Sequence, residues 1–189
     1  MVSSRLTIAI DAMGGDHAPA AVVRGVNIAR QRYPQVHFVT YGREEEVRPL
    51  LKKMRRLRDC TTLVHTDQVV RGDDRPSVAL RSGRNSSMRL AVNAVKDGVA
   101  QAAVSGGNTG ALMAMAKFAL KTMPGVDRPA IASFFPTLKG ESVMLDLGAN
   151  VQCDANNLAQ FAIMGSAFAR SVLGISAPSY GLLNVGSEE

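Results

Sequence analysis

The sequence predicts an α/β fold, a mainly parallel sheet with helices on both faces. Short apolar runs that end in turn residues alternate along the chain with longer stretches of helical periodicity. Strands that alternate with helices imply parallel strands joined by helical crossovers. The chain has 189 residues, of which 46% are hydrophobic, and neither a linker nor an internal repeat interrupts it. We therefore expect residues 1–189 to form a single α/β domain.

The first third of the chain contains three predicted strands, over residues 6–10, 36–41 and 61–65. Pro19 opens a predicted helix after the first strand, because proline suits the first turn of a helix. A second, basic helix is expected over residues 44–54. Pro49 lacks a backbone N–H and fits poorly inside it, so we expect its start near Arg48.

The remainder continues the alternation of strands and helices. We expect a loop at residues 73–77, helices over residues 86–96, 111–120 and 158–173, and strands over residues 101–105, 130–135, 142–147 and 180–185.

Polar turns that carry glycine follow four of these strands. In open parallel sheets, ligands bind at the carboxyl ends of the strands, so we expect the four turns to form one rim. The turns are residues 11–17, 105–111, 146–150 and 184–186. Their predicted supporting residues are Asp11, Gly14, Gly15, Asp16, Asp146 and Gly148.

The turn at residues 105–111 is the strongest functional signal. Its glycines let the backbone approach a ligand closely, and the helix that follows points free N–H groups at the turn. This arrangement binds phosphate or another oxyanion. The predicted ligands are Ser105, Gly106, Gly107, Asn108 and Thr109. The alternative is a tight connection with Asn108 or Thr109 as helix N-cap. The turn matches no nucleotide-binding fingerprint.

Other polar side chains of the predicted rim suit acyl transfer to an oxyanion. His17 could position phosphate, act as a general acid or cap the next helix. Asn150 and Asn184 are candidate donors to the oxyanion of a tetrahedral intermediate. Asp11 and Asp146 are expected to orient donors, because a carboxylate beside phosphate would repel it.

The two cysteines, Cys60 and Cys153, are too few for a disulfide framework and indicate a reducing compartment. Cys153 is either a small buried residue or a nucleophile that forms an acyl-enzyme thioester. No set of His, Cys and Asp has the spacing of metal ligands. We therefore expect neither a metal nor a cofactor.

The net charge of +6 is concentrated in residues 24–58, which hold ten Lys and Arg against three Glu. This basic stretch is either a solvated helix face or a dock for an acidic partner. Nucleic acid is a poor candidate, because basic and aromatic residues do not interleave and Trp is absent. No apolar run is long enough to span a membrane and the N-terminus lacks a signal core, so we expect a cytoplasmic protein.

Several blocks, in this order, resemble the PlsX-type phosphate acyltransferases of bacterial phospholipid synthesis. The longest are IAIDAMGGDHAP at residues 8–19 and VSGGNTGALM at residues 104–113. Shorter blocks lie at residues 75–77, 84–88, 128–130, 145–150, 160–165 and 183–186. The resemblance covers nearly the whole chain.

The resemblance implies an enzyme that moves a fatty acyl group from acyl carrier protein to inorganic phosphate, giving acyl phosphate for a membrane glycerol-3-phosphate acyltransferase. It also implies a homodimer in the cytosol or loosely at the inner face of the membrane. The implied fold is that of the isocitrate/isopropylmalate dehydrogenases and phosphotransacetylases. The basic stretch is then the predicted dock for the acidic carrier protein, through Arg48, Lys52, Arg55, Arg56 and Arg58.

Members of this family are much longer, so the chain resembles an N-terminal portion with the C-terminal part missing. Two alternatives therefore stay open: a phosphotransacetylase-like enzyme that uses acyl-CoA, and an inactive truncated fragment. A dehydrogenase of similar fold is a weaker alternative, because clustered carboxylates for Mg²⁺ and a dinucleotide-binding turn are not evident.

Overall fold

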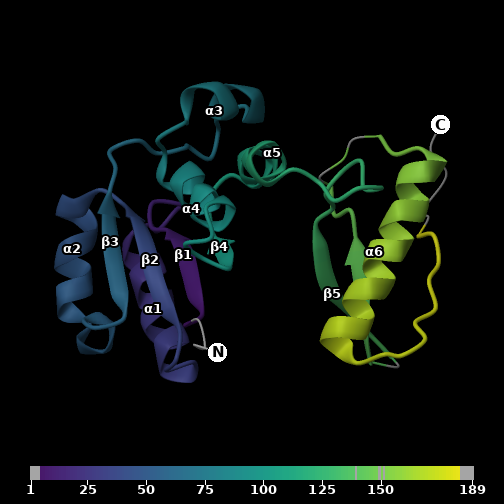
Figure 1. The fold of residues 1–189 in the computed structure, drawn as a ribbon, viewed down its shortest axis with the longest axis horizontal. Helices are drawn as coiled ribbons and strands as arrows, with labels where there is room; N and C mark the ends of the chain where they lie inside the picture. The colour runs from purple at the N-terminus through teal and green to yellow at the C-terminus, as the bar shows by residue number, and fades with distance from the viewer. Residues whose placement is uncertain (1–4, 139, 149, 151, 184–189) are drawn as a thin grey trace. The chain divides into compact units, whose positions relative to one another are not determined.

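The computed structural model describes residues 5–138, 140–148, 150 and 152–183 (Figure 1). The chain divides into two compact units, Met1–Lys121 and Thr122–Glu189. The single domain expected over residues 1–189 stays a prediction.

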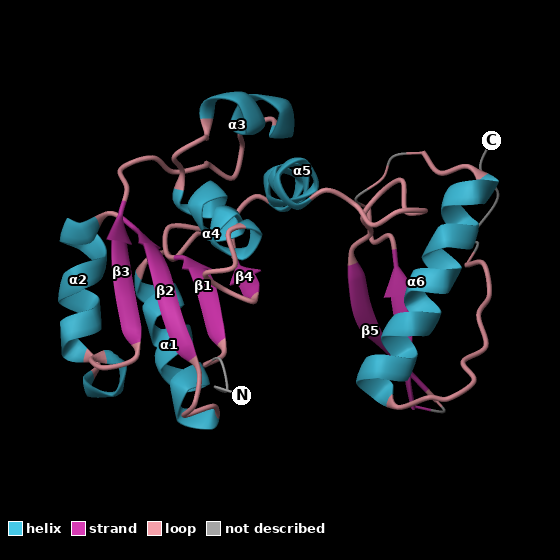
Figure 2. Ribbon diagram, in the orientation of Figure 1, coloured by secondary structure: helices cyan, strands magenta, loops and turns pink. Residues whose placement is uncertain are grey.

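The first unit is built on a fully parallel sheet of four strands in the order β3-β2-β1-β4 (Figure 2). The strands are β1 (Thr7–Asp11), β2 (His37–Gly42), β3 (Thr61–His65) and β4 (Ala102–Val104). The predicted strands of this part of the chain are therefore confirmed, within one or two residues at their ends.

Helices connect these strands, and the last helix of this unit follows β4. They are α1 (Ala20–Arg32), α2 (Glu44–Lys53), the short 3-10 helix η1 (Arg55–Leu57), α3 (Pro76–Ser82), α4 (Ser87–Lys96) and α5 (Thr109–Leu120). Ser86 caps α4, since its hydroxyl accepts a hydrogen bond from the N–H of Arg89 at 3.2 Å.

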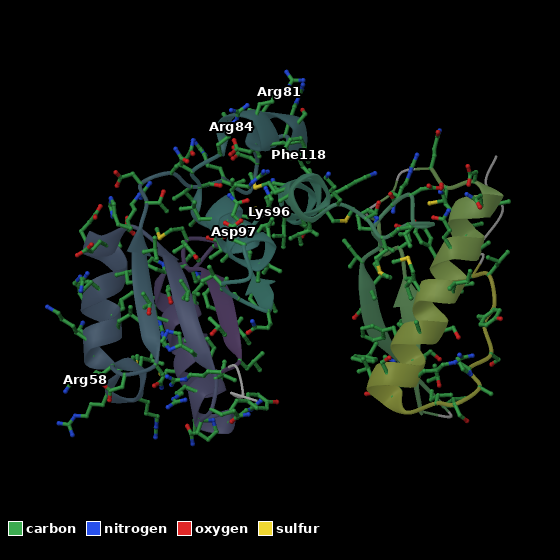
Figure 3. The ribbon with its side chains drawn as sticks, in the orientation of Figure 1. Arg58, Arg81, Arg84, Lys96, Asp97 and Phe118 are labelled. Carbon is green, nitrogen blue, oxygen red and sulfur yellow. The ribbon has the colours of Figure 1, made fainter. Side chains whose placement is uncertain are left out.

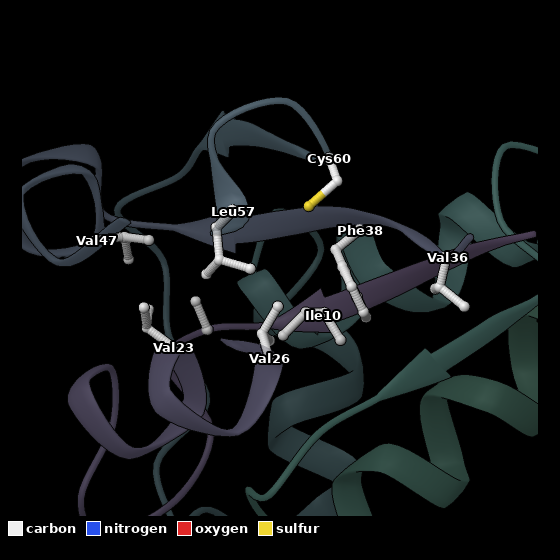
Figure 4. Close-up of a cluster of buried hydrophobic side chains, with 9 residues drawn as sticks. Ile10, Val23, Val26, Val36, Phe38, Val47, Leu57 and Cys60 are labelled. Carbon is white, nitrogen blue, oxygen red and sulfur yellow. The ribbon is translucent and has the colours of Figure 1, made fainter. Parts of the chain in front are cut away.

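Buried apolar clusters lie on both faces of this sheet. Neighbouring residues of a strand point to opposite faces, so Phe38 and Val39 belong to different clusters. Val39 packs with Ala91 of α4. On the other face, the cluster drawn in Figure 4 joins β1 and β2 to α1, α2 and η1; it comprises Ile10, Ala12, Val23, Val26, Val36, Phe38, Val47, Leu57 and Cys60. The predicted parallel sheet with helices on both faces is confirmed for this unit.

Two local predictions in the first unit were wrong. Helix α2 begins at Glu44 and includes Pro49. The three glutamates of its first turn favour the positive end of the helix, and Glu44 also pairs with Arg48 at 2.7 Å. The loop expected at residues 73–77 ends at Arg75, because Pro76 is the first residue of α3.

The second unit contains an antiparallel pair of strands, β5 (Ala132–Thr137) and β6 (Gly140–Leu145), and helix α6 (Ala155–Leu173). Asp154 and Asn157 form a capping box at the start of α6. The predicted strands exist, but their assignment to the parallel sheet was wrong. A parallel crossover needs about a dozen residues, and two residues separate these strands.

The strand expected over residues 180–185 is absent from its described part, residues 180–183, and residues 184 and 185 lie outside the described residues. Over the described part of the chain, the helices are all too short or too polar to cross a bilayer.

Candidate functional site

The turns after β1 and β4 meet at the carboxyl edge of the sheet, because these two strands are neighbours. The hydroxyl of Ser105 donates a hydrogen bond to Oδ2 of Asp11 at 2.6 Å and accepts one from the N–H of Gly107 at 3.1 Å. Oδ1 of the buried Asp11 accepts a bond from the N–H of Met13 at 3.2 Å. The Asp11 carboxylate therefore holds both turns, the one after β1 through the N–H of Met13 and the one after β4 through the hydroxyl of Ser105.

Glycine is required where these two turns touch. A Cβ atom on Gly14 would lie 2.5 Å from Oδ2 of Asp11, 2.7 Å from Oγ of Ser105 and 2.8 Å from the nitrogen of Gly107. Gly15 has a φ of +108°, a conformation that other residues rarely adopt. The two turns are therefore packed backbone against backbone.

Asn108 is the N-cap of α5, as one reading of the sequence predicts. Its Oδ1 accepts a bond from the N–H of Ala111 at 2.9 Å. Its Nδ2 donates to the carbonyl oxygens of Gly72 at 3.0 Å and Asp74 at 2.8 Å, with a longer bond of 3.4 Å to that of Arg71. The side chain thus ties the loop before α3 to the start of α5, and its role as a phosphate ligand stays a prediction.

The first turn of α5 offers unpaired backbone donors. Within the described residues, the N–H groups of Thr109 and Gly110 have no hydrogen-bond acceptor. They lie at the positive end of the helix dipole, where an anion is stabilised. The geometry of this turn therefore suits a small oxyanion such as phosphate.

Asp16 and His17 are exposed in the turn between β1 and α1. The carbonyl of His17 accepts a bond from the N–H of Ala21 at 3.0 Å, but the described residues include no hydrogen-bond partner for its imidazole. The general-acid role of His17 stays a prediction.

A second polar cluster lies in the second unit, around Asp146. Oδ1 of Asp146 accepts bonds from the backbone N–H of Asn150 at 3.2 Å and from its Nδ2 at 2.8 Å. The same Nδ2 donates to the carbonyl of Pro129 at 3.2 Å. Both hydrogens of this amide are therefore engaged in this conformation, and the role of Asn150 as an oxyanion donor stays a prediction.

The backbone of this cluster adopts left-handed conformations, with φ of +64° at Asp146 and +80° at Gly148. For a residue other than glycine this conformation stores strain, which the surrounding bonds must offset. The three bonds that the Asp146 carboxylate accepts, two from Asn150 and one from Cys153, supply that support.

Cys153 is a poor nucleophile in this setting. Its thiol donates a hydrogen bond to Oδ2 of Asp146 at 3.2 Å. This bond, with smaller contributions from desolvation and the negative charge of Asp146, raises the pKa of the Cys153 thiol above its usual value. The protonated thiol does not attack carbonyl carbon. The structure therefore argues against a nucleophilic role, although Cys153 is partly exposed and not the small buried residue that the other reading expects.

The prediction that all four polar turns follow strands of one parallel sheet was wrong. The turns at residues 11–17 and 105–111 lie on the parallel sheet, but the turn at residues 146–150 follows β6 of the antiparallel pair. The fourth turn, with Asn184, lies outside the described residues.

The predicted carrier-protein dock lies on α2 and the segment that follows it. Arg55, Arg56 and Arg58 come between the end of α2 and the start of β3, which places them at the amino edge of the sheet. Figure 3 shows Arg58 at the opposite end of the first unit from Arg81 and Arg84. The docking role of the set Arg48, Lys52, Arg55, Arg56 and Arg58 stays a prediction.

One cluster that the sequence did not suggest has the residue types of a metal site. The ligand atoms of Glu45, His65 and Asp67 lie within 4.8 Å of one another, and all three residues are exposed. However, Nδ1 of His65 accepts a bond from the N–H of Glu44 at 3.2 Å, which leaves the ring proton on Nε2, 3.5 Å from Asp67. A histidine that binds a metal through Nε2 carries its proton on Nδ1 and donates a hydrogen bond from that nitrogen, whereas Nδ1 of His65 accepts one. We assign this cluster no metal.

Comparison with known proteins places the chain in one family. Residues 6–189 match the family described as "Fatty acid synthesis protein". A relative from Rhodospirillum centenum named "Phosphate acyltransferase" is 65% identical over 188 residues, which is 100% of this chain and 53% of that protein. A protein of the same name from Paramagnetospirillum magneticum is 55% identical over 188 residues, which is 100% of this chain and 54% of that protein. The chain thus spans about half the length of these relatives.

Solved structures support the fold. A phosphotransacetylase from Streptococcus pyogenes superposes with a TM-score of 0.66 at 22% identity, over 92% of this chain and 56% of that one. The EutD phosphotransacetylase from Staphylococcus aureus gives a TM-score of 0.60 at 18% identity, over 88% of this chain and 53% of that one. The fold is therefore a mixed α/β fold like that of phosphotransacetylases. With the match over residues 6–189, the chain belongs to the fatty acid synthesis protein family, that of the PlsX-type phosphate acyltransferases.

Proposed function

We propose that this chain carries the phosphate site of an enzyme that transfers a fatty acyl group from acyl carrier protein to inorganic phosphate, giving acyl phosphate. The observation that carries the proposal is the name "Phosphate acyltransferase" of relatives that match the chain along its whole length. The unpaired donors at the start of α5 supply a place for the phosphate.

The proposed reaction begins with phosphate at the N–H groups of Thr109 and Gly110. Phosphate is already anionic, so the site must position it rather than deprotonate it. One phosphate oxygen attacks the carbonyl carbon of the acyl thioester and forms a tetrahedral intermediate. When this intermediate collapses, the carbon–sulfur bond breaks and its electron pair leaves with the carrier thiolate. The products are acyl phosphate and the free carrier.

Three further side chains assist this step in the proposal. Donors aimed at the developing oxyanion are each worth about 3 kcal/mol, and Asn150 and Asn184 are the proposed side-chain donors. To donate to the oxyanion, Asn150 must give up its bond to Asp146 or its bond to the carbonyl of Pro129. The leaving thiolate has a conjugate pKa of about 8.5, so it needs little help from an acid, and His17 is the proposed source of that help. Because the Cys153 thiol is held protonated by Asp146, we propose direct attack by phosphate without an acyl-enzyme.

The remaining parts of the proposal come from the resemblance. They are a homodimer, a location in the cytoplasm or at the inner face of the membrane, delivery of the product to a membrane glycerol-3-phosphate acyltransferase, and the finer likeness to the dehydrogenase-like fold. The likeness to phosphotransacetylase structures keeps acyl-CoA as the second candidate donor.

The test is release of carrier thiol from an acyl–acyl carrier protein, followed with increasing phosphate for this chain and for a full-length protein of the family. We expect release to saturate with phosphate, to match acyl phosphate formation one to one, and to be faster than with acyl-CoA. Cys153→Ala should keep this activity. Thiol release without phosphate, or a clear preference for acyl-CoA, would contradict the proposal. Activity of the full-length protein alone would identify this chain as an inactive portion.

A further inference from the structure

We propose that an arginine surface around α3 docks the acidic carrier protein, an inference that rests on the proposed function. We define the α3 surface by Arg75, Arg81 and Arg84. All three are exposed, and within the described residues none of them makes an ion pair or a side-chain hydrogen bond. Residues 71–89 hold five arginines against two aspartates, so the whole segment is basic.

The α3 surface borders the proposed phosphate turn. Asn108 binds the carbonyl of Asp74, and Pro76 lies 2.8 Å from the position that a Cβ atom on Gly110 would take. Arg75 lies between Asp74 and Pro76 in the sequence, so residues on both sides of it contact the start of α5. Ala79 of α3 also shares a buried cluster with Met115 of α5. A partner bound to α3 is therefore next to the donors of the α5 turn.

The other basic surface is less well placed for delivery. Arg55, Arg56 and Arg58 precede β3 and lie at the amino edge of the sheet, whereas the phosphate turn lies at the carboxyl edge. A five-residue strand such as β3 spans about 16 Å, which separates the two edges. The thioester on the carrier protein must reach the bound phosphate. A carrier docked on the α3 surface, at the carboxyl edge, is therefore closer to the phosphate than one docked at the amino edge.

Unpaired arginines also suit an acidic partner in energetic terms. Arg48 of α2 already pairs with Glu44 at 2.7 Å, and Arg71 pairs with Asp73 at 3.3 Å. Binding an external carboxylate there competes with an existing partner. The guanidinium groups of the α3 surface have none among the described residues, so they offer both long-range attraction and free bidentate donors. Arg55, Arg56 and Arg58 are unpaired in the same way, so the position beside the phosphate turn is what distinguishes the α3 surface.

The test compares two triple variants of a full-length protein of the family. R75Q/R81Q/R84Q removes three charges from the α3 surface. The matched control, R32Q/K53Q/K96Q, removes three charges from exposed residues that each end a helix, α1, α2 and α4. We expect the α3 variant to raise KM for the acyl carrier protein about tenfold at low salt and much less at high salt. Its KM for phosphate and its rate with a small acyl thioester should stay within about twofold, as should every parameter of the control.

Three results would overturn the proposal: an unchanged KM for the carrier protein, an equal rise in the control, or an equal or larger rise in R55Q/R56Q/R58Q. If the α3 triple variant does not fold, each single substitution should raise KM about two- to threefold, and three unchanged values would contradict the docking surface.

Direct binding of the carrier protein without its acyl group separates this inference from the proposed function. If the wild type makes no acyl phosphate but binds the carrier, and R75Q/R81Q/R84Q weakens that binding, the enzyme assignment fails and the docking surface stands. If the wild type does not bind the carrier, the docking surface fails as well.

Discussion

Replacing Gly14 by alanine should reduce phosphate-dependent activity about a hundredfold and lower the free energy of unfolding by about 2 kcal/mol. The added methyl group would lie within 2.8 Å of Asp11, Ser105 and the backbone of Gly107. None of these neighbours is the free end of a flexible side chain, because Ser105 is bonded to Asp11 at 2.6 Å and to Gly107 at 3.1 Å. The substitution must therefore move the turn that leads into α5.

Gly25 provides a matched control for this change. It lies in the interior of α1, and a Cβ atom there would have no neighbour within 4 Å. Alanine is favoured over glycine by about 1 kcal/mol inside a helix, so Gly25→Ala should stabilise the protein and leave activity unchanged. Thermal unfolding and initial rates would measure both. If Gly14→Ala behaves like Gly25→Ala, the packing of the two turns does not matter for function.

Replacing Asn108 by alanine should lower the free energy of unfolding by about 2 kcal/mol and raise KM for phosphate. The change removes the N-cap of α5 and also the bonds to the carbonyls of Gly72 and Asp74. Without the cap, the first turn of α5 frays and the N–H groups of Thr109 and Gly110 lose their fixed direction. Thermal unfolding and the phosphate dependence of the rate would measure the two effects.

Aspartate at position 108 separates the two roles of the side chain. Asn108→Asp keeps an oxygen for the N–H of Ala111 but loses both donor hydrogens, and its charge faces the loop carbonyls and any bound phosphate. We expect it to retain more stability than Asn108→Ala but to have the higher KM for phosphate. Equal KM values for the wild type and both variants would show that phosphate binds elsewhere.

The local elements of the first unit were predictable because each has its own signal. The run at Leu6–Ile10 leads into a glycine-rich turn and the run at Val36–Tyr41 ends at Gly42, and Ser86 stands directly before the periodic stretch of α4. The turn at Ser105–Thr109 was also predictable, since its glycines stand between a strand and a helix, whereas its role as an anion site stays a prediction. These signals depend on residues close in sequence.

What the sequence did not predict depends on contacts between distant residues. The bonds from Asn108 to the loop at residues 71–74 connect positions more than thirty residues apart. The antiparallel pairing of β5 and β6 could have been inferred from the short connection between them, but both were assigned to the parallel sheet. The bond from Cys153 to Asp146, which opposes a nucleophilic role, depends on the left-handed turn at Asp146.

The central claim is that phosphate binds at the first turn of α5. The direct measurement is a phosphate titration of the isotope-labelled protein, followed by backbone amide chemical shifts. We expect saturating shifts at Thr109 and Gly110, with smaller shifts at Gly14 and Gly107 of the adjoining turns. Saturating shifts confined to another part of the chain, with the Thr109 and Gly110 signals unmoved, would contradict the claim.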